Sequence, residues 1–372
     1  MALSAKTIQV VKATAPVVAE NAVKITSIFY PTMFKNNPEA LRYFNRTNQR
    51  KGMQQQALAT AVGAYANNID NLGALSGAVE KIAHRHVALS ITPDLYGIVH
   101  KNLMLAIAEA LGDAVTPEVA EAWDEAVLAL AKICIDTEEQ LYQSCEARVG
   151  GWRGEREFVL AKKTKKAESV VAFDFKAADG YIGGFEHTPG QYLTIRLRDW
   201  APRHYTITSA PGSETLQCTT RLAPSGDVSG HMHKEMQEGD KCLLGPPAGI
   251  FTPQPGGGAA ALISAGIGIT PMWAFLQHFG ASDVKLALHV EDTPERHAYR
   301  EAFEASGVNC RWHYTDGRGR PDIAAEANAA ATAAGRDAAF YVCGPVPFMD
   351  AMCGALRSEG ATRVFSEKFG TG

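Results

Sequence analysis

The segment RVGGWRG, Arg148 to Gly154, separates two different patterns in the sequence. Before it, apolar residues recur with helical spacing, and helix-starting signals such as TPEVAEAW, from Thr116 to Trp123, are present. After it, short runs such as QYLTIRL and LQCTTRL have the composition of strands, and turn residues separate them. The glycine-rich segment therefore ends an all-α domain and begins an antiparallel β domain, either a barrel or a sandwich.

The last third of the sequence has a third pattern. Buried apolar runs alternate with helical segments, as in AALIS followed by TPMWAFLQHF and VKLALHV followed by PERHAYREAFEA. This alternation is typical of a parallel, doubly wound sheet. A chain of 372 residues is also too long for one ordinary core. We therefore expect a multidomain protein, with an all-α domain over 1–148, an antiparallel β domain over 149–255 and an α/β domain over 256–372.

Composition excludes several classes of partner. The net charge is -4, from 36 basic and 40 acidic residues, which argues against a nucleic-acid partner because binding phosphate backbones needs a clustered positive face. The seven cysteines are scattered without a CxxC pair, as expected in a reducing compartment without a zinc cluster. The uncharged stretch between Lys241 and Asp283 is interrupted by prolines and glycines, so it predicts no transmembrane helix. The N-terminus lacks an export signal, and we expect a cytoplasmic protein; the sequence indicates no oligomeric state.

Two histidines lie close together in EKIAHRHVALS, from Glu80 to Ser90. In a helix, residues two positions apart point about 200° away from each other, so His84 and His86 cannot face one pocket. His86 falls within an apolar stripe, whereas His84 falls on the opposite, solvent-facing side. His86 is therefore either a core histidine with a backbone partner or a buried ligand.

Two loops have the composition of a phosphate-binding edge. In LISAGIGITPM, a strand runs into glycines and a helix follows, in which Thr270 is expected to cap the first turn and Pro271 to occupy it. In YVCGPVPFM, a second strand ends in CGP at the carboxyl edge, where open α/β sheets bind ligands. A tight turn without a ligand remains the alternative. The residues concerned are Gly266, Gly268, Thr270, Pro271, Cys343, Gly344 and Pro345.

The β domain carries two further ligand signals. In RHYTI, we expect Arg203, Tyr205 and Thr206 to meet one ligand, because arginine suits phosphate, tyrosine can stack on a flat ring and a hydroxyl can bond a ring nitrogen. In SGDVSGHMHKEM, a helix start offers amides and the hydroxyl at Val228 and Ser229 to a pyrophosphate. Ordinary strand polarity would explain any one of these features alone.

Together, these motifs resemble the ferredoxin reductase family, with its RxY[ST] strand, GxVS helix, glycine-rich loop and CGP motif. The resemblance implies an FAD-binding β-barrel over 149–255 and an NAD(P)-binding domain over 256–372. It places FAD at Tyr192, Arg203, Tyr205, Thr206, Val228, Ser229 and Phe369. It places NADH or NADPH at Gly266, Gly268, Thr270, Pro271, Cys343, Gly344 and Pro345.

A reductase needs an electron acceptor, and a helical domain with one inward histidine suits haem. The whole chain resembles the flavohaemoglobins, which join a globin to such a reductase. The resemblance implies haem b ligated by His86, which Tyr96 and Glu138 would hold by hydrogen bonds. The remaining haem-pocket residues that it implies are Tyr30, Phe44, Gln54, Leu58 and Arg85. Because Pro31 follows Tyr30 directly, we expect the helix that carries Tyr30 to be kinked or broken there.

The function that this resemblance implies is nitric oxide dioxygenation. O2 and NO would be the small-molecule substrates, and NAD(P)H would supply electrons through FAD and haem to give nitrate. Two alternatives remain: a general flavin reductase for peroxides, quinones or ferric chelates, and an oxygen sensor or store. Glu291 and Asp292 could bond the ribose hydroxyls of NADH, whereas Arg296 could accept the 2'-phosphate of NADPH.

Overall fold

The structure is a computed structural model that describes residues 3–44, 53–224, 226–255 and 258–369. The chain divides into two compact units. The first holds the residues up to Cys145 with the short segment Asp199–Pro202, and the second holds Glu146–Arg198 and the chain from Arg203. The second unit contains both a barrel and a parallel sheet, so the three expected domain boundaries stay predictions.

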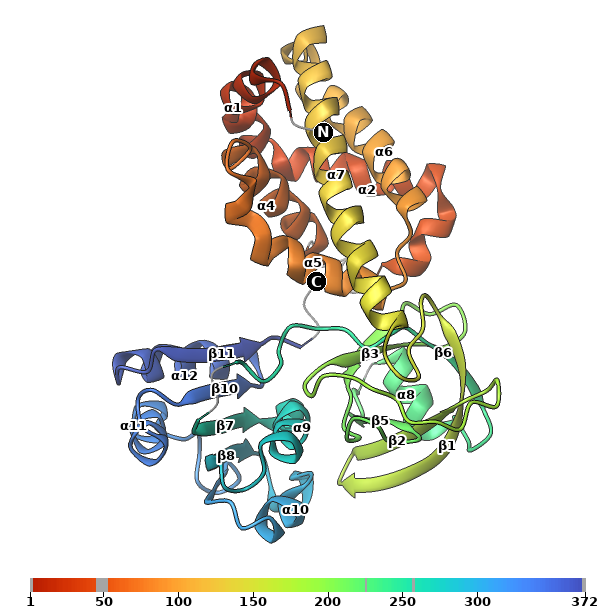
Figure 1. The fold of residues 1–372 in the computed structure, drawn as a ribbon. Helices are drawn as coiled ribbons and strands as arrows, with labels where there is room; N and C mark the ends of the chain where they lie inside the picture. Colours follow the sequence, from red (N-terminus) through yellow and green to blue (C-terminus); the bar gives the residue numbers. More distant parts are fainter. Residues whose placement is uncertain (1–2, 45–52, 225, 256–257, 370–372) are drawn as a thin grey trace. The chain divides into compact units, whose positions relative to one another are not determined.

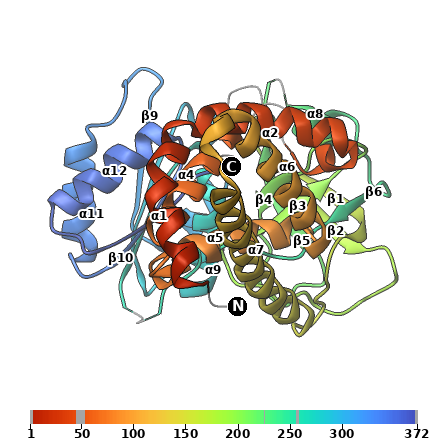
Figure 2. The ribbon, with the colours of Figure 1, turned by 90° about the horizontal axis from the view of Figure 1, so that it is seen from above.

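The first unit is built from helices, which appear in red to yellow in Figure 1. α2 packs against α4 and α6, and Figure 2 shows α2 beside α6 from above. Their shared core includes the fully buried side chains of Phe29, Ile107 and Trp123. The elements are α1 (Ala5–Glu20), α2 (Ala22–Asn36), η1 (Pro38–Tyr43), α4 (Met53–Asn67), η2 (Leu72–Leu75), α5 (Ser76–Ala88), α6 (Pro93–Leu111), η3 (Gly112–Ala114) and α7 (Pro117–Glu146).

The expected break at Pro31 does not occur. α2 runs from Ala22 to Asn36 with Pro31 inside it. A proline in a helix loses one backbone hydrogen bond. Here the flanking part of α2 is held by tertiary packing, since Phe29, Tyr30 and Met33 are all buried in the core of the unit. Packing therefore outweighs the local preference of the residue before proline.

The barrel of the second unit is a six-stranded sheet in the order β4-β3-β6-β1-β2-β5, with antiparallel pairing throughout. A bridge between Ile207 and Cys218 brings the segments after β4 and within β5 together, so the two edges of the sheet meet. The strands and the helix between β5 and β6 are β1 (Arg156–Ala167), β2 (Val170–Ala177), β3 (Tyr192–Arg196), β4 (Arg203–Thr206), β5 (Leu216–Arg221), α8 (Asp227–Lys234) and β6 (Lys241–Leu244).

The parallel sheet has the order β11-β10-β7-β8-β9. α9 covers one face, and α11 and α12 cover the other (Figure 1). Successive residues of β7 enter opposite cores: Leu262 packs on the α9 side, and Ile263 packs on the α11 and α12 side. The elements are β7 (Ala260–Ala265), η4 (Gly266–Gly268), α9 (Ile269–Phe279), β8 (Val284–Glu291), η5 (Pro294–Arg296), α10 (Arg300–Ala305), β9 (Cys310–Tyr314), α11 (Ile323–Ala334), β10 (Ala339–Cys343), α12 (Val346–Ser358) and β11 (Arg363–Glu367).

Candidate functional sites

His86 lies at the centre of a hydrogen-bonded group formed by three helices. Nδ1 of His86, on α5, lies 2.7 Å from Oε1 of Glu138 on α7 and 2.8 Å from the hydroxyl oxygen of Tyr96 on α6. The Tyr96 hydroxyl also donates to Glu138. Burial, with the neighbouring Glu138 carboxylate, raises the pKa of Tyr96, so its hydroxyl keeps the proton that it donates. The three residues that the sequence predicted to act together are therefore in direct contact.

This geometry leaves Nε2 as the ring nitrogen of His86 for a metal. A histidine that ligates a metal commonly donates its other ring N–H to a carboxylate, which fixes the tautomer and raises the basicity of the ligand. The Glu138 side chain is 5% exposed, whereas that of His86 is 32% exposed. The imidazole is thus anchored on its buried side and open on the other. The donor set fits haem iron, because a neutral imidazole is a usual axial ligand.

Exposure alone does not separate the two neighbouring histidines. His84 is half-buried, and so is His86, so the expectation that His84 faces solvent is only partly met. His86 points toward α6 and α7, where Tyr96 and Glu138 hold its ring. The core histidine with a backbone partner is excluded as a description of His86, since Nδ1 is bonded to side chains.

The other residues expected in the haem pocket lie on several elements of the helical unit. Tyr30 is buried, with its ring centroid 5.7 Å from that of Phe44 in an edge-to-face arrangement. Leu58, on α4, is partly buried against the same core. Arg85 is half-buried in the last turn of α5. The side chain of Gln54 lies outside the described residues.

Burial raises the pKa of Tyr30, so its hydroxyl remains protonated at neutral pH. The ring of Tyr30 packs against the rings of Phe29, Phe34 and Phe44. A protonated hydroxyl in an aromatic setting is a hydrogen-bond donor that a small polar ligand can use. A hydrogen-bond donor agrees with the expected position of Tyr30 in the haem pocket, and that position stays a prediction.

The strand expected to hold a flavin is β4, and its side chains alternate. Arg203 and Tyr205 lie on one face and are half-buried, whereas Thr206 is buried on the other face. Thr206 pairs across the sheet with Tyr192, whose ring lies 4.8 Å from that of His204. Consecutive residues of a strand point in opposite directions, so Thr206 does not share the face of Arg203 and Tyr205. A ligand could meet all three only at the end of β4.

The helix start expected to bind a pyrophosphate is present. α8 begins at Asp227 with Gly226 as its N-cap and no side-chain cap, so its first amides are not taken by a capping side chain. Val228 and Ser229 are both buried, and the Ser229 hydroxyl accepts a hydrogen bond from the Ala223 amide at 3.2 Å. This contact folds the preceding loop onto the helix.

Phe369, expected to cover the flavin ring, follows β11 and is 39% exposed. An aromatic side chain of this exposure can still shield a flat ligand. Its role stays a prediction.

The two loops expected to bind a nicotinamide dinucleotide touch each other at their glycines. A Cβ on Gly268 would lie 2.5 Å from the carbonyl oxygen of Cys343, and a Cβ on Gly344 would lie 3.1 Å from backbone atoms of Ala265. Gly266 has a φ of 57°, a conformation that glycine adopts without strain. The glycines therefore serve close backbone packing at the carboxyl edge of the sheet. The same bare backbone fits a phosphate cradle.

One expectation about a side chain at this edge is wrong. Thr270 does not cap α9: the helix begins at Ile269, and the Thr270 hydroxyl donates to the carbonyl of Ile267 at 3.0 Å. Pro271 lies in the first turn, as expected. Cys343 is fully buried, and its thiol donates to the carbonyl of Glu367 at 3.4 Å. Burial also raises the pKa of the Cys343 thiol. Pro345 is exposed and precedes α12.

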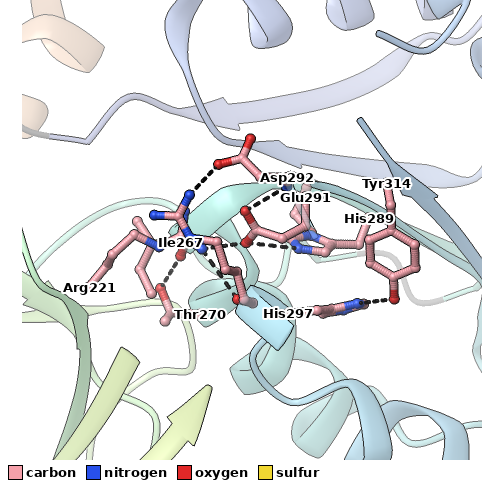
Figure 3. A network of polar contacts seen from close by, with 10 residues as sticks. Arg221, Ile267, Thr270, His289, Glu291, Asp292, His297 and Tyr314 are labelled. Carbon is pink, nitrogen blue, oxygen red and sulfur yellow. Dashed lines mark hydrogen bonds and ion pairs between the residues drawn. The ribbon is translucent and has the colours of Figure 1, made fainter. Parts of the chain in front are cut away.

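Glu291 is not a free ribose-binding carboxylate. It is 4% exposed and forms an ion pair with Arg221 of β5, which reaches across from the barrel (Figure 3). Burial alone would raise the pKa of Glu291, but the nearby His289 imidazole and the hydrogen bonds from Arg221 and the Asp292 amide outweigh it and lower that pKa to about 2. Asp292 lies nearer the surface and pairs with Arg296 at 2.5 Å. The two acidic residues therefore have cationic partners within the chain.

Arg221 was not predicted from the sequence. Its Nη1 atom would lie 3.3 Å from a Cβ placed on Gly266, so the guanidinium borders the glycine loop. Thr219 and Arg221 lie two residues apart on β5 and share a face, which is a strand pattern visible in LQCTTRL. The pattern indicates the face, but not that this face meets the parallel sheet.

Comparisons with known proteins agree with both halves of this description. The model of the family described as Globin matches residues 27–134. A flavohemoprotein of Bordetella pertussis is 37% identical over 402 residues, which cover 100% of this chain and 99% of that protein. Flavohemoprotein A of Dictyostelium discoideum is 35% identical over 378 residues, with 95% of this chain and 94% of that protein covered.

A solved structure is similar along its full length. The crystal structure of flavohemoglobin from Malassezia yamatoensis with bound FAD and heme has a TM-score of 0.85 and 28% identity, and the match covers 99% of this chain and 100% of that one. The helical unit, the antiparallel barrel and the parallel sheet thus occur together in both. The chain belongs to the flavohaemoprotein family, in which a globin domain that holds haem is joined to a reductase module that holds FAD and a nicotinamide dinucleotide.

Proposed function

We propose that the protein is a nitric oxide dioxygenase, an oxidoreductase that oxidises NO to nitrate with O2 and NAD(P)H by way of FAD and haem b. The observation that carries this proposal is the Glu138 carboxylate at 2.7 Å from Nδ1 of His86. A carboxylate that pulls on this N–H increases electron donation from Nε2. Strong donation suits oxygen activation rather than reversible storage.

The chain's own residues have distinct roles in this proposal. His86 would ligate the iron through Nε2, with Tyr96 and Glu138 fixing the imidazole ring and its tautomer. Tyr30 would donate a hydrogen bond on the opposite side of the haem, because burial keeps its hydroxyl protonated. The remaining haem-pocket residues in the proposal are Phe44, Gln54, Leu58 and Arg85.

The reductase residues would bind and orient the electron carriers. Arg203 would pair with a phosphate, Tyr205 would stack on the flavin and the uncapped start of α8 would face the pyrophosphate. Gly266, Gly268 and Gly344 would let the backbone approach the nicotinamide dinucleotide. When bound, FAD and haem supply the redox chemistry, two electrons from the nicotinamide being passed on one at a time. The further residues proposed to line these sites are Tyr192, Thr206, Val228, Ser229, Phe369, Thr270, Pro271, Cys343 and Pro345.

The experiment that tests the proposal compares NO consumption by the purified protein under NADH with and without O2. We expect consumption that requires both NADH and O2 and yields nitrate, from a protein whose absorption spectrum shows haem and flavin. A protein that reduces quinones or ferric chelates but does not consume NO in the presence of O2 would be a flavin reductase instead. A protein that binds O2 without turnover would be a sensor or store.

None of the described helices is long and apolar enough to cross a membrane.

A further inference from the structure

Tyr299 lies where the barrel and the parallel sheet of the second unit meet, and it is held in an unusual conformation. Its φ of 61° and ψ of 6° fall in the left-handed region, although it is not a glycine. A bulky residue persists there only where surrounding contacts hold it. Its ring stacks on Trp273 of α9, with centroids 5.0 Å apart and planes 12° from parallel, and the residue is 7% exposed.

The Tyr299 hydroxyl begins a chain of buried hydrogen bonds into the barrel. It lies 2.5 Å from Oγ1 of Thr219, which lies 3.0 Å from Oγ1 of Thr208. The Thr208 hydroxyl donates to the side-chain oxygen of Gln217 at 3.1 Å. A hydroxyl has one proton, so Thr208 must accept from Thr219, and Thr219 must accept from Tyr299. Tyr299 is therefore the donor at the end of a chain that runs in one direction, and each bond polarises the next.

A second contact, from α9, also holds Thr208. Nε2 of Gln277 donates to the backbone carbonyl of Thr208 at 3.2 Å. Gln277 and Trp273 lie one turn apart on α9, the helix that follows the glycine loop. Thr208 is thus held at its carbonyl by Gln277 of α9 and at its hydroxyl by Thr219, to which Tyr299 donates in turn. Thr208 follows Thr206, the last residue of β4, by two positions.

We infer that Tyr299 is a positioning residue for hydride transfer, because its hydroxyl, acting through Thr219 and Thr208, fixes the flavin strand β4 against the nicotinamide helix α9. The inference rests on the proposed function, since it takes β4 and α9 to hold FAD and the dinucleotide. Hydride moves between two bound rings, and a misplacement of about 1 Å can slow such a step by about 100-fold. A tie between the two carriers therefore acts on the rate rather than on the binding of either one.

The test uses the full-length Tyr299→Phe variant, which keeps the ring stacked on Trp273 and removes the hydroxyl alone. We expect flavin reduction by NADH, followed anaerobically by stopped flow, to slow by about tenfold or more. FAD content and the Kd for NADH should change by less than about twofold, because the variant touches neither binding site. In the flavin-free protein, amide hydrogen exchange around Thr208 should become faster.

Two further variants make the result specific. Thr219→Val breaks the same chain one link along, so it should slow flavin reduction to a similar extent. The double variant should be no slower than either single one, because both remove one shared interaction. Tyr314→Phe is the matched control: its hydroxyl is bonded to Nδ1 of His297 at 3.0 Å on the sheet side, and its loss should leave rate and exchange unchanged (Figure 3).

Each outcome decides the inference. Wild-type rates and exchange in Tyr299→Phe would overturn it, as would loss of FAD with an unchanged rate in the remaining holoenzyme, which would indicate a structural role alone. If Tyr299→Phe does not fold, Thr219→Val supplies the same reading. Failure of the proposed function looks different: the flavin of the wild-type protein would not be reduced by NADH or NADPH at all. In that case, amide hydrogen exchange around Thr208 that is unchanged in flavin-free Tyr299→Phe would still show that Tyr299 does not hold Thr208.

Discussion

The helical unit and the parallel sheet prepare their cofactor sites in opposite ways. At His86, two polar side chains contact Nδ1 and fix the orientation of the ring, so the site for a ligand at Nε2 is built from side chains. At the carboxyl edge of the sheet, the site is built from backbone, with Gly268 packed so closely on Cys343 that a Cβ would lie 2.5 Å from a carbonyl oxygen. The charged side chain there, Glu291, is already paired with Arg221.

The difference follows from what each cofactor requires of the protein. An iron ligand needs one nitrogen in a fixed orientation, and hydrogen bonds to the other ring nitrogen supply that orientation. A pyrophosphate needs several amides at close range, which glycine and the start of a helix supply without side chains. A single side-chain substitution should therefore abolish function at the first site, whereas at the second site it should act mainly through stability.

The largest expected effect is that of His86→Ala in the first unit. The variant should lose or misligate haem and stop consuming NO, because Nε2 is the proposed ligand. Reduction of ferricyanide by NADH should continue, since it needs only the flavin. Haem absorbance, the rate of NO consumption and the rate of ferricyanide reduction, all measured on one preparation, check this prediction.

His84→Ala is the matched control, because it removes an imidazole from the same helix two positions away. It should retain haem and NO consumption, since the partners that hold the ligand are those of His86. Retention of haem in His86→Ala together with its loss in His84→Ala would show that the wrong histidine has been assigned.

The next effect concerns Glu291 and is one of stability with a defined pH dependence. The pKa of Glu291 is lowered from 4.5 to about 2 in the folded protein. A lowered carboxyl pKa contributes stability that is present above the unfolded value and is lost as the pH falls through the folded value. The contribution is therefore about 3 kcal/mol above pH ~5 and should disappear toward pH ~2.

Chemical unfolding of the wild type and Glu291→Gln across this pH range measures the difference. The gap in free energy of unfolding should be constant near neutral pH and should close as the solution becomes acidic. Asp292→Asn is the control, because Asp292 is 59% exposed and its pair with Arg296 should contribute little. A gap that does not change with pH would mean that Glu291 is not ionised in the fold.

The globin half of this comparison was largely predictable from the sequence. The positions of Tyr96 and Glu138 relative to His86 came from the family resemblance, and the structure places all three within hydrogen-bonding distance. The helical wheel favoured His86 over His84 as the inward-facing residue because helical periodicity fixes which residues share a face. The role of His86 as an iron ligand stays a prediction. The reductase strands and the glycine loops were predictable for the same reason, since each is a local pattern.

The errors arose where distant segments meet. Local preference predicted a break at Pro31, but packing keeps α2 continuous. The position of Glu291 at the end of a strand left it open to bond ribose, but Arg221, 70 residues earlier in the chain, pairs with it. No sequence spacing contains these contacts, because they depend on which elements become neighbours.

A smaller effect is expected for Arg203→Ala at the flavin strand. Loss of a charge-assisted bond to a phosphate should weaken FAD binding by roughly 1.5 to 3 kcal/mol. Equilibrium dialysis of FAD against the apoprotein would measure this. Lys241→Ala, which removes a barrel charge that is 63% exposed, should leave FAD affinity unchanged. Equal affinities in the wild type and Arg203→Ala would mean that β4 does not hold the phosphates.

The smallest effect, and the one that bears most directly on the distal side of the haem, is expected for Tyr30→Phe. The variant keeps the aromatic packing against Phe44 and removes one buried donor. A hydrogen bond of this kind contributes roughly 1 to 2 kcal/mol, so oxygen should leave the ferrous protein about 5- to 30-fold faster. Haem content should not change, because the iron ligand lies on α5. Flash photolysis or stopped-flow mixing gives the dissociation rate directly. An unchanged rate would place the Tyr30 hydroxyl outside the pocket, despite the continuous α2, and would leave the oxygen-binding side of this globin without its proposed donor.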